Sequence, residues 1–117
     1  MKPEELKKRT KQFVLLVLKV IKALPKCQES DVFGRQLLRS ASSVGANYRS
    51  ACRARSQADF ISKITVVEEE ADESGYWMEL IIESGLLNNE TIQSALKEAN
   101  ELTAIFTASG NTAKKNK

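Results

Sequence analysis

The sequence predicts an all-α protein, an antiparallel up-down-up-down four-helix bundle. Apolar residues recur every three or four positions in four successive segments, and the alternating Val, Ile and Thr runs typical of strands are missing. Glycine and proline are scarce, with five and two among 117 residues, so few helix breakers interrupt these segments. The connections between the segments are short, so consecutive helices must be antiparallel neighbours.

The length of the chain favours one domain. A compact chain of 117 residues buries roughly two-thirds of the surface of its unfolded form, which is enough for one core. We expect the bundle to cover residues 1–110 and the tail, residues 111–117, to be disordered.

The first two helices are predicted from their apolar stripes and from their ends. The first is expected over residues 3–24, because Pro25 disfavours helix at the residue before it. The second is expected to begin near Ser30 or Asp31, both good N-cap residues, and to run to about residue 54. Its apolar stripe comprises Phe33, Leu37, Ala41, Val44, Tyr48 and Cys52.

The third and fourth helices carry stronger end signals. Ser56 can cap the first turn of the third helix, which is expected to end at the C-cap glycine Gly85. Gly75 lies inside this helix, where glycine costs about 1 kcal/mol relative to alanine, and a bend is expected there. Asn88 or Asn89 is expected to cap the fourth helix, which would end at residue 110.

Several function classes are disfavoured by composition. The chain has no histidine, which removes the commonest general base and the usual zinc ligand, so we expect no enzyme, metal or other cofactor. Cys27 and Cys52 form no Cys-x-x-Cys pair and are expected to be reduced residues of the core or its boundary. The longest apolar run, residues 13–18, is too short to span a bilayer, and nothing resembles a signal peptide. We therefore expect a cytoplasmic protein without a membrane partner.

Small polar residues form a separate row on the second helix. On a helical wheel this row lies between the apolar stripe and a row of outward arginines, and Arg39 lies at the edge of the arginine row. Such a row allows another helix to approach closely and to exchange hydrogen bonds. The row comprises Gln36, Ser40, Ser43 and Asn47.

Two glutamates of the third helix complement this row. Glu70 and Glu73 share a stripe with Trp77, and a carboxylate flanked by apolar groups needs a partner. Arg39 is the expected partner, because a guanidinium can hold carboxylates through several hydrogen bonds. Two interpretations are open, a structural network that fixes helix register and a ligand-binding or catalytic pocket, and the first is favoured. The expected polar network comprises Gln36, Arg39, Ser43, Asn47, Glu70, Glu73 and Trp77.

This combination resembles a known family. The spacing Q-x-x-R-x-x-x-S-x-x-x-N that begins at Gln36, followed by E-x-x-E-x-x-x-W from Glu70, is similar to that of the four-helix bundle proteins encoded in intervening sequences of bacterial 23S ribosomal RNA genes. The resemblance covers residues 33–87, and Gly75 departs from it where threonine or serine is expected.

The resemblance implies a homopentameric ring with no assigned catalytic activity. It extends to an accessory protein of diversity-generating retroelements, which binds nucleic acid and partners a reverse transcriptase. It therefore implies a homo-oligomer, with RNA or DNA and a protein such as a reverse transcriptase as further partners.

Charge is distributed unevenly along the chain. Residues 1–55 contain 13 Lys or Arg against 4 acids, whereas residues 56–88 contain 1 against 8. The lysines and arginines of the first two helices fall in rows that are open to two interpretations. They could bind nucleic-acid phosphates, or they could contact the acidic face of another copy in self-assembly. No aromatic platform accompanies them, so recognition of single-stranded bases is not expected. The candidate nucleic-acid-binding residues are Lys8, Lys19, Lys22, Lys26, Arg35, Arg49 and Arg53.

Together these patterns predict a non-enzymatic, oligomeric helical bundle that binds structured RNA or DNA or scaffolds a nucleic-acid-associated complex. The alternative is a protein-binding adaptor or a structural oligomer with no role in nucleic-acid binding.

Overall fold

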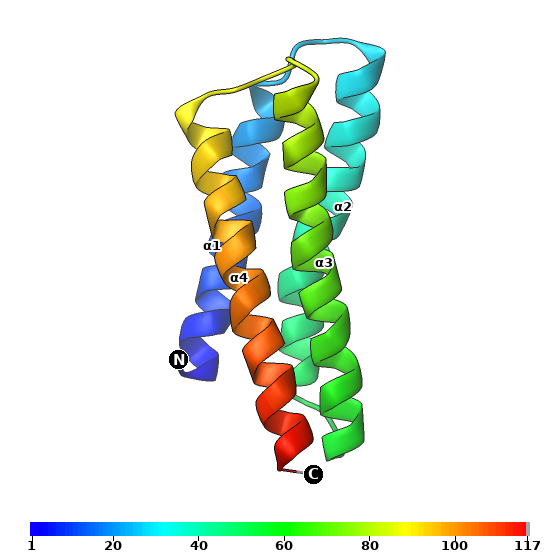
Figure 1. Cartoon of the computed structure of the whole chain (residues 1–117), viewed down its shortest axis with the longest axis vertical. Helices are drawn as coiled ribbons and strands as arrows, with labels where there is room; N and C mark the ends of the chain where they lie inside the picture. Colours follow the sequence, from blue (N-terminus) through cyan, green and yellow to red (C-terminus); the bar gives the residue numbers. More distant parts are fainter. Residues whose placement is uncertain (117) are drawn as a thin grey trace.

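The four apolar stripes form four α-helices in the computed structural model, which describes residues 1–116 (Figure 1). The helices are α1 (Pro3–Lys22), α2 (Gln28–Ala51), α3 (Gln57–Glu83) and α4 (Glu90–Lys115). Consecutive helices run in opposite directions along a body of 47 × 22 × 19 Å. The prediction of an all-α four-helix bundle is confirmed.

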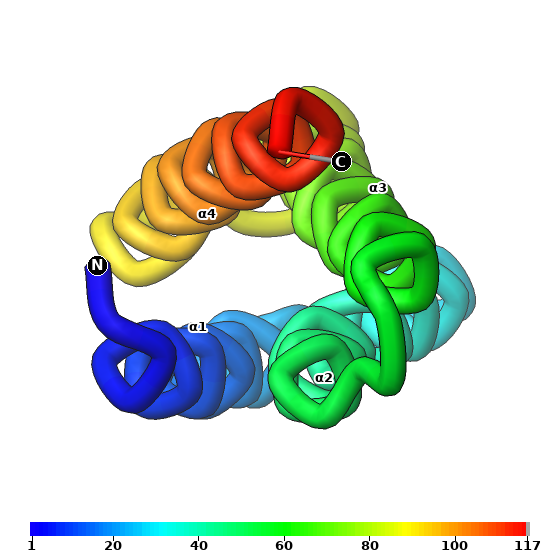
Figure 2. The backbone as a smooth tube through the Cα atoms, turned by 90° about the horizontal axis from the view of Figure 1, so that it is seen from below, coloured from blue at the N-terminus to red at the C-terminus, as the bar shows by residue number. Residues whose placement is uncertain are grey.

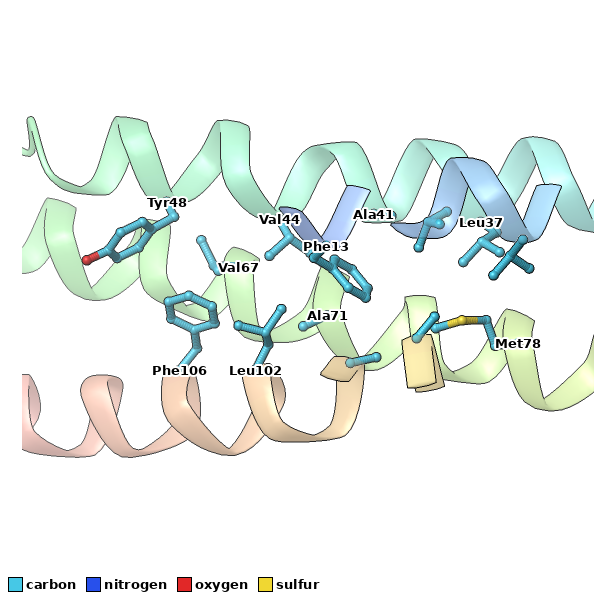
Figure 3. Close-up of a cluster of buried hydrophobic side chains, with 14 of the residues drawn as sticks. Phe13, Leu37, Ala41, Val44, Tyr48, Val67, Ala71, Met78, Leu102 and Phe106 are labelled. Carbon is cyan, nitrogen blue, oxygen red and sulfur yellow. The ribbon is translucent and has the colours of Figure 1, made fainter. Parts of the chain in front are cut away.

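Each helix packs against two others around a shared core. Helix α1 contacts α2 and α4, and α3 contacts the same two helices, so the four form a closed square seen end-on (Figure 2). Buried residues of all four stripes fill the centre (Figure 3), where the rings of Tyr48 and Phe106 lie 5.3 Å apart. Cys52, which was expected to extend the stripe of α2, is exposed because the helix ends one residue before it.

Side-chain caps begin two helices as predicted. The Ser56 hydroxyl accepts a hydrogen bond from the Asp59 amide at 3.0 Å, and the Asn89 side-chain oxygen accepts one from the Ile92 amide at 2.9 Å. Each cap satisfies an amide that the first helical turn leaves free. The start points of α3 and α4 are therefore fixed locally.

Gly85, the predicted C-cap of α3, lies directly after the C-cap residue Ser84. Its φ of +81° lies in the left-handed region, and the next amide, of Leu86, returns to the Ile81 carbonyl at 3.1 Å. Glycine reaches this conformation without the steric cost of a Cβ. The chain is thereby turned toward α4.

The prediction that Ser30 or Asp31 caps α2 is wrong. The helix begins at Gln28 after an extended Cys27, and Ser30 is buried within the first turn, where its hydroxyl accepts a hydrogen bond from the Cys27 thiol at 3.3 Å. No side chain caps this end, and Glu29 and Asp31 place negative charge at the positive end of the helix instead. At its other end α2 stops at residue 51, and α1 stops at residue 22, slightly earlier than expected.

The prediction that the fourth helix ends at residue 110 is also wrong. Helix α4 continues through residues 111–115, which were expected to belong to a disordered tail, and Lys117 of that tail lies outside the described residues. Gly110 is buried, and a Cβ there would lie 3.6 Å from Ile64, so this glycine marks a helix contact and not a helix end. The Gln57 amide donates to the Ala113 carbonyl at 2.6 Å, which holds the added turns against α3.

Two buried or half-buried glycines should respond oppositely to alanine. At Gly75, where α3 is uninterrupted, a Cβ would make ordinary contacts of 3.6 Å with Asn100 and 3.8 Å with Leu96. Gly75→Ala is therefore expected to raise the free energy of unfolding by about 0.5–1 kcal/mol, the difference in helix propensity. At Gly45 a Cβ would lie 3.2 Å from the Thr10 hydroxyl, which must then move by a few tenths of an ångström. Hydrogen bonds to the Leu6 and Lys7 carbonyls hold this hydroxyl in place, so Gly45→Ala should be destabilising.

Urea unfolding monitored by circular dichroism measures both effects. Each variant serves as the control for the other, because both replace a helical glycine by alanine. A destabilised Gly75→Ala variant would contradict the packing described for α3 and α4.

Candidate nucleic-acid interface and polar network

Arg39 joins α2 to α3 through two glutamates. Its guanidinium donates to the Glu70 carboxylate at 3.0 Å and also to the Glu73 carboxylate. The Trp77 indole N–H donates to the same Glu73 oxygen at 2.9 Å, and the Arg39 Nε donates to the Gln36 side chain at 3.3 Å. The structure thus brings five of the seven predicted network residues together.

The other two predicted members form a separate contact. The Asn47 amide donates to the Ser43 hydroxyl at 2.7 Å and to the Ser43 carbonyl at 2.9 Å, and neither residue bonds a glutamate. The expectation that they complete the arginine network is wrong, because they lie one to two turns farther along α2. Ser40 and Ser74, by contrast, are fully buried and bond across the α2–α3 interface at 3.0 Å.

Hydrogen bonding favours the ionised forms of Glu73 and Arg39. The Trp77 indole and, after it, Arg39 lower the pKa of Glu73, although partial burial opposes them. The same carboxylates, Glu73 first and then Glu70, raise the pKa of Arg39. A carboxylate held ionised by fixed donors is poorly suited to carry a proton at neutral pH. The geometry favours a structural ion network over acid–base chemistry.

The lowered pKa of Glu73 predicts a specific loss of stability in acid. The ionised form is favoured in the folded state, so its contribution is present above the unfolded value of about 4.5 and disappears as pH falls through the folded value. Glu73→Gln should therefore lose less stability than the wild type between pH 7 and pH 3. Urea midpoints across this range measure the difference, with Glu69→Gln, which removes an exposed carboxylate of the same helix, as the control.

A second arginine joins α1 to α4 in the same way. Arg9 donates through two nitrogens to the two oxygens of Glu98, both at 2.7 Å, and to Glu101 at 3.1 Å. These bonds, that to Glu98 above all, raise the pKa of Arg9. The sequence reasoning missed this cluster, although Glu98 and Glu101 repeat the i, i+3 spacing of the α3 glutamates. Two arginine links therefore secure two opposite seams of the bundle.

A groove of about 560 Å³ lies between the first half of α1 and the second half of α2. Thr10, Val14 and Gly45 lie along it, and the absence of a Cβ at Gly45 lets Thr10 of α1 approach α2 closely. One acid, Glu4, also lines it and pairs with Lys7 at 3.3 Å. The cations that line the groove, here called the groove cluster, are Lys7, Lys8, Lys11, Arg49 and Arg53.

The groove contains three of the seven candidate nucleic-acid-binding residues and adds two that the sequence reasoning missed. Lys7 and Lys11 were missed because their neighbours depend on how α1 aligns with α2. The four remaining candidates lie toward the other end of these two helices, and all seven are exposed. Within residues 1–116 none of the seven forms an ion pair. The four candidates outside the groove, here called the distal cluster, are Lys19, Lys22, Lys26 and Arg35.

The described residues offer neither a metal site nor a membrane-spanning helix. Among residues 1–116, no group of three His, Cys, Asp or Glu side chains is arranged to hold a metal ion. None of the helices described is both long and apolar enough to cross a membrane.

Known proteins similar to this chain share its fold. The family model described as 23S rRNA-intervening sequence protein matches residues 4–108, which include nearly all of the four helices. A crystal structure from Bacteroides thetaiotaomicron, described as a protein with unknown function from the S23 ribosomal protein family, is similar with 32% identity and a TM-score of 0.84. The similarity covers 95% of this chain and 99% of that one. No curated protein matches this chain.

Proposed function

Since the chain belongs to the 23S rRNA-intervening sequence protein family, we propose that it is a cytoplasmic, non-enzymatic homo-oligomer that binds the phosphates of structured RNA or DNA. The single observation that carries the proposal is the groove between α1 and α2. Five cations line it, and only Lys7 among them has an acidic partner in residues 1–116. Exposed cations without partners release counterions from a phosphate backbone and so gain binding free energy.

The composition of the groove favours the backbone over the bases. No aromatic side chain lines it, so it offers no surface on which unpaired bases could stack. Small side chains such as Ser42, Gly45 and Ala46 leave its floor open between the longer cationic ones. Phosphate contacts of this kind give affinity with little sequence preference.

A non-enzymatic role agrees with the state of the polar network. Both of its glutamates already bond Arg39, and neither lines the groove. The groove itself offers no histidine, cysteine or paired carboxylates for acid–base or nucleophilic chemistry.

Salt dependence of RNA binding tests the proposal. Four of the groove cations do not pair with Glu4. If each contacts one phosphate, the logarithm of the binding constant should fall with the logarithm of salt concentration with a slope of about −3.6, which is a loss of affinity of about 150-fold between 50 and 200 mM. Fluorescence anisotropy with a labelled RNA hairpin whose stem of about 4 base pairs is too short to extend beyond the groove measures this slope. Absence of binding at 50 mM salt would refute the proposal.

Assembly is proposed from the complementary faces of the bundle. The outer face of α3 carries Glu69, Asp72, Glu79 and Glu83 around an exposed Tyr76, while the face of α1 and α2 is basic. A contact between unlike faces of two copies can be repeated from copy to copy. It forms a closed ring when the rotation between neighbouring copies is a whole fraction of a full turn. Five copies, as the family resemblance implies, would have a mass of about 65 kDa from chains of 13.0 kDa. Light scattering that gives the mass of one chain at all concentrations would exclude this assembly.

A protein-binding adaptor is the second candidate. Exposed apolar side chains favour it, since Leu15 and Tyr76 are 58% and 53% exposed on different helices. A partner such as a reverse transcriptase should then remain bound after nuclease treatment of the complex. A partner that is lost on digestion would instead be held through nucleic acid.

A further inference from the structure

The groove cluster and the distal cluster lie along one face of the bundle. Because α1 and α2 are antiparallel, with Thr10 beside Gly45 and Ile21 near Gly34, both helices contribute to both ends of this face. Lys11 and Lys22 are separated by eleven residues, which is almost three complete helical turns, so they point in nearly the same direction.

Other pairs that join the two clusters are also separated by nearly whole numbers of helical turns. Lys8 and Lys19 are also eleven residues apart, and Arg35 and Arg53 are eighteen apart, which is five turns. At about 1.5 Å per residue, these pairs are separated by about 17 to 27 Å along the helix axes. The face therefore presents two groups of positive charge at a fixed separation.

Acidic side chains interrupt this face only near its ends. Residues 12–18 of α1 and 36–48 of α2 contain no Asp or Glu, and Leu15 and Leu38 are exposed between the clusters. The two acids on this face are Glu4 in the groove and Asp31 near the start of α2. A ligand that contacts both clusters meets no negative charge between them.

We infer that the ligand is a nucleic-acid duplex long enough to contact the groove cluster and the distal cluster at once, an inference that rests on the proposed function. A separation of about 17 to 27 Å corresponds to about five to eight base pairs at 3.4 Å each. A duplex is stiff over this length, so its phosphates can contact both clusters without a loss of conformational entropy in the nucleic acid. A single strand must be ordered to do so, and the residues that line the groove include no aromatic side chain to hold its bases.

Two RNA hairpins with the same loop and different stems test the inference. One stem of about 4 base pairs reaches a single cluster, and one of about 12 base pairs reaches both. The variant Lys19→Gln, Lys22→Gln, Arg35→Gln removes three distal contacts. It should weaken binding of the long stem by about 100- to 500-fold at about 0.1 M salt and leave the short stem within about 3-fold of the wild type, since only the long stem spans both clusters.

The matched control removes three exposed cations from another face of the protein. Lys97→Gln, Lys114→Gln, Lys115→Gln changes the net charge equally on α4 and should leave both affinities within about 3-fold. An unstructured strand of the same length as the long hairpin should bind more weakly than that hairpin. Circular dichroism verifies that each variant is folded.

Specific outcomes would overturn the inference. An equal loss for both stems would mean that the distal cluster acts only through a general field, and no loss for the long stem would mean that it is not contacted. A single strand that binds as tightly as the long stem would exclude the duplex as the preferred class. Preferential, distal-dependent binding to vesicles containing phosphatidylserine would assign this face to a membrane surface. Absence of any RNA binding at 50 mM salt would refute the proposed function itself, which is a different result from binding that ignores stem length.

Discussion

The variant Lys11→Gln, Arg49→Gln, Arg53→Gln is expected to bind structured RNA about 500-fold more weakly than the wild type at about 0.1 M salt. All three side chains line the groove, and none forms an ion pair within residues 1–116, so their loss leaves no acid unpaired. Each phosphate contact contributes about 0.9 to the salt slope, so the slope should become shallower by about 2.7. Anisotropy titrations over a range of salt concentrations measure both quantities.

The effect of a lower net charge must be distinguished from the effect of losing these particular groove cations. The α4 triple variant at Lys97, Lys114 and Lys115 has the same net charge and should retain the wild-type salt slope. Two equal slopes for the groove and α4 variants would show that only net charge matters, and the groove would then lose its assigned role.

The variant Arg39→Met is expected to lower the free energy of unfolding by about 2 kcal/mol. Removal of the Arg39 guanidinium leaves Glu70, whose side chain is only 14% exposed, without a partner and close to the carboxylate of Glu73. The effect should fall below the 3–5 kcal/mol typical of fully buried pairs, roughly by half, because Arg39 and Glu73 are 49% and 35% exposed. Urea unfolding at pH 7 measures the loss.

A compensating variant distinguishes the unpaired charge from lost packing. Arg39→Met combined with Glu70→Gln and Glu73→Gln removes the stranded charges and should recover most of the stability. If the triple variant is as unstable as Arg39→Met alone, the arginine acts through its apolar stem and not through its charge.

The sequence was most informative where structure is decided locally. Apolar periodicity identified all four helices, and the caps at Ser56, Asn89 and Gly85 depend on bonds to residues only a few positions away. The pairing of Arg39 with the α3 glutamates was accessible because a half-buried carboxylate requires a nearby cation.

Features that depend on how helices distant in sequence pack together could not be predicted from local sequence patterns. The bond between Arg9 and Glu98 joins residues 89 positions apart, and no local pattern indicates that α1 and α4 meet there. The same reason explains Gly110, which looked like a helix end but lies at a contact with Ile64. Cap propensity at Ser30 was likewise overridden by its burial.

An even number of alternating helices returns the chain to the end of the bundle where it began, so the start of α1 and the end of α4 lie at the same end (Figure 1). The groove opens near that end, since Glu4 and Arg53 both line it. A fluorophore, affinity tag or fused domain at either terminus would therefore crowd the phosphate-binding surface. The turn that follows α3 lies at the opposite end, which is also the end of the distal cluster, so a probe attached there leaves the groove accessible but not the whole phosphate-binding face.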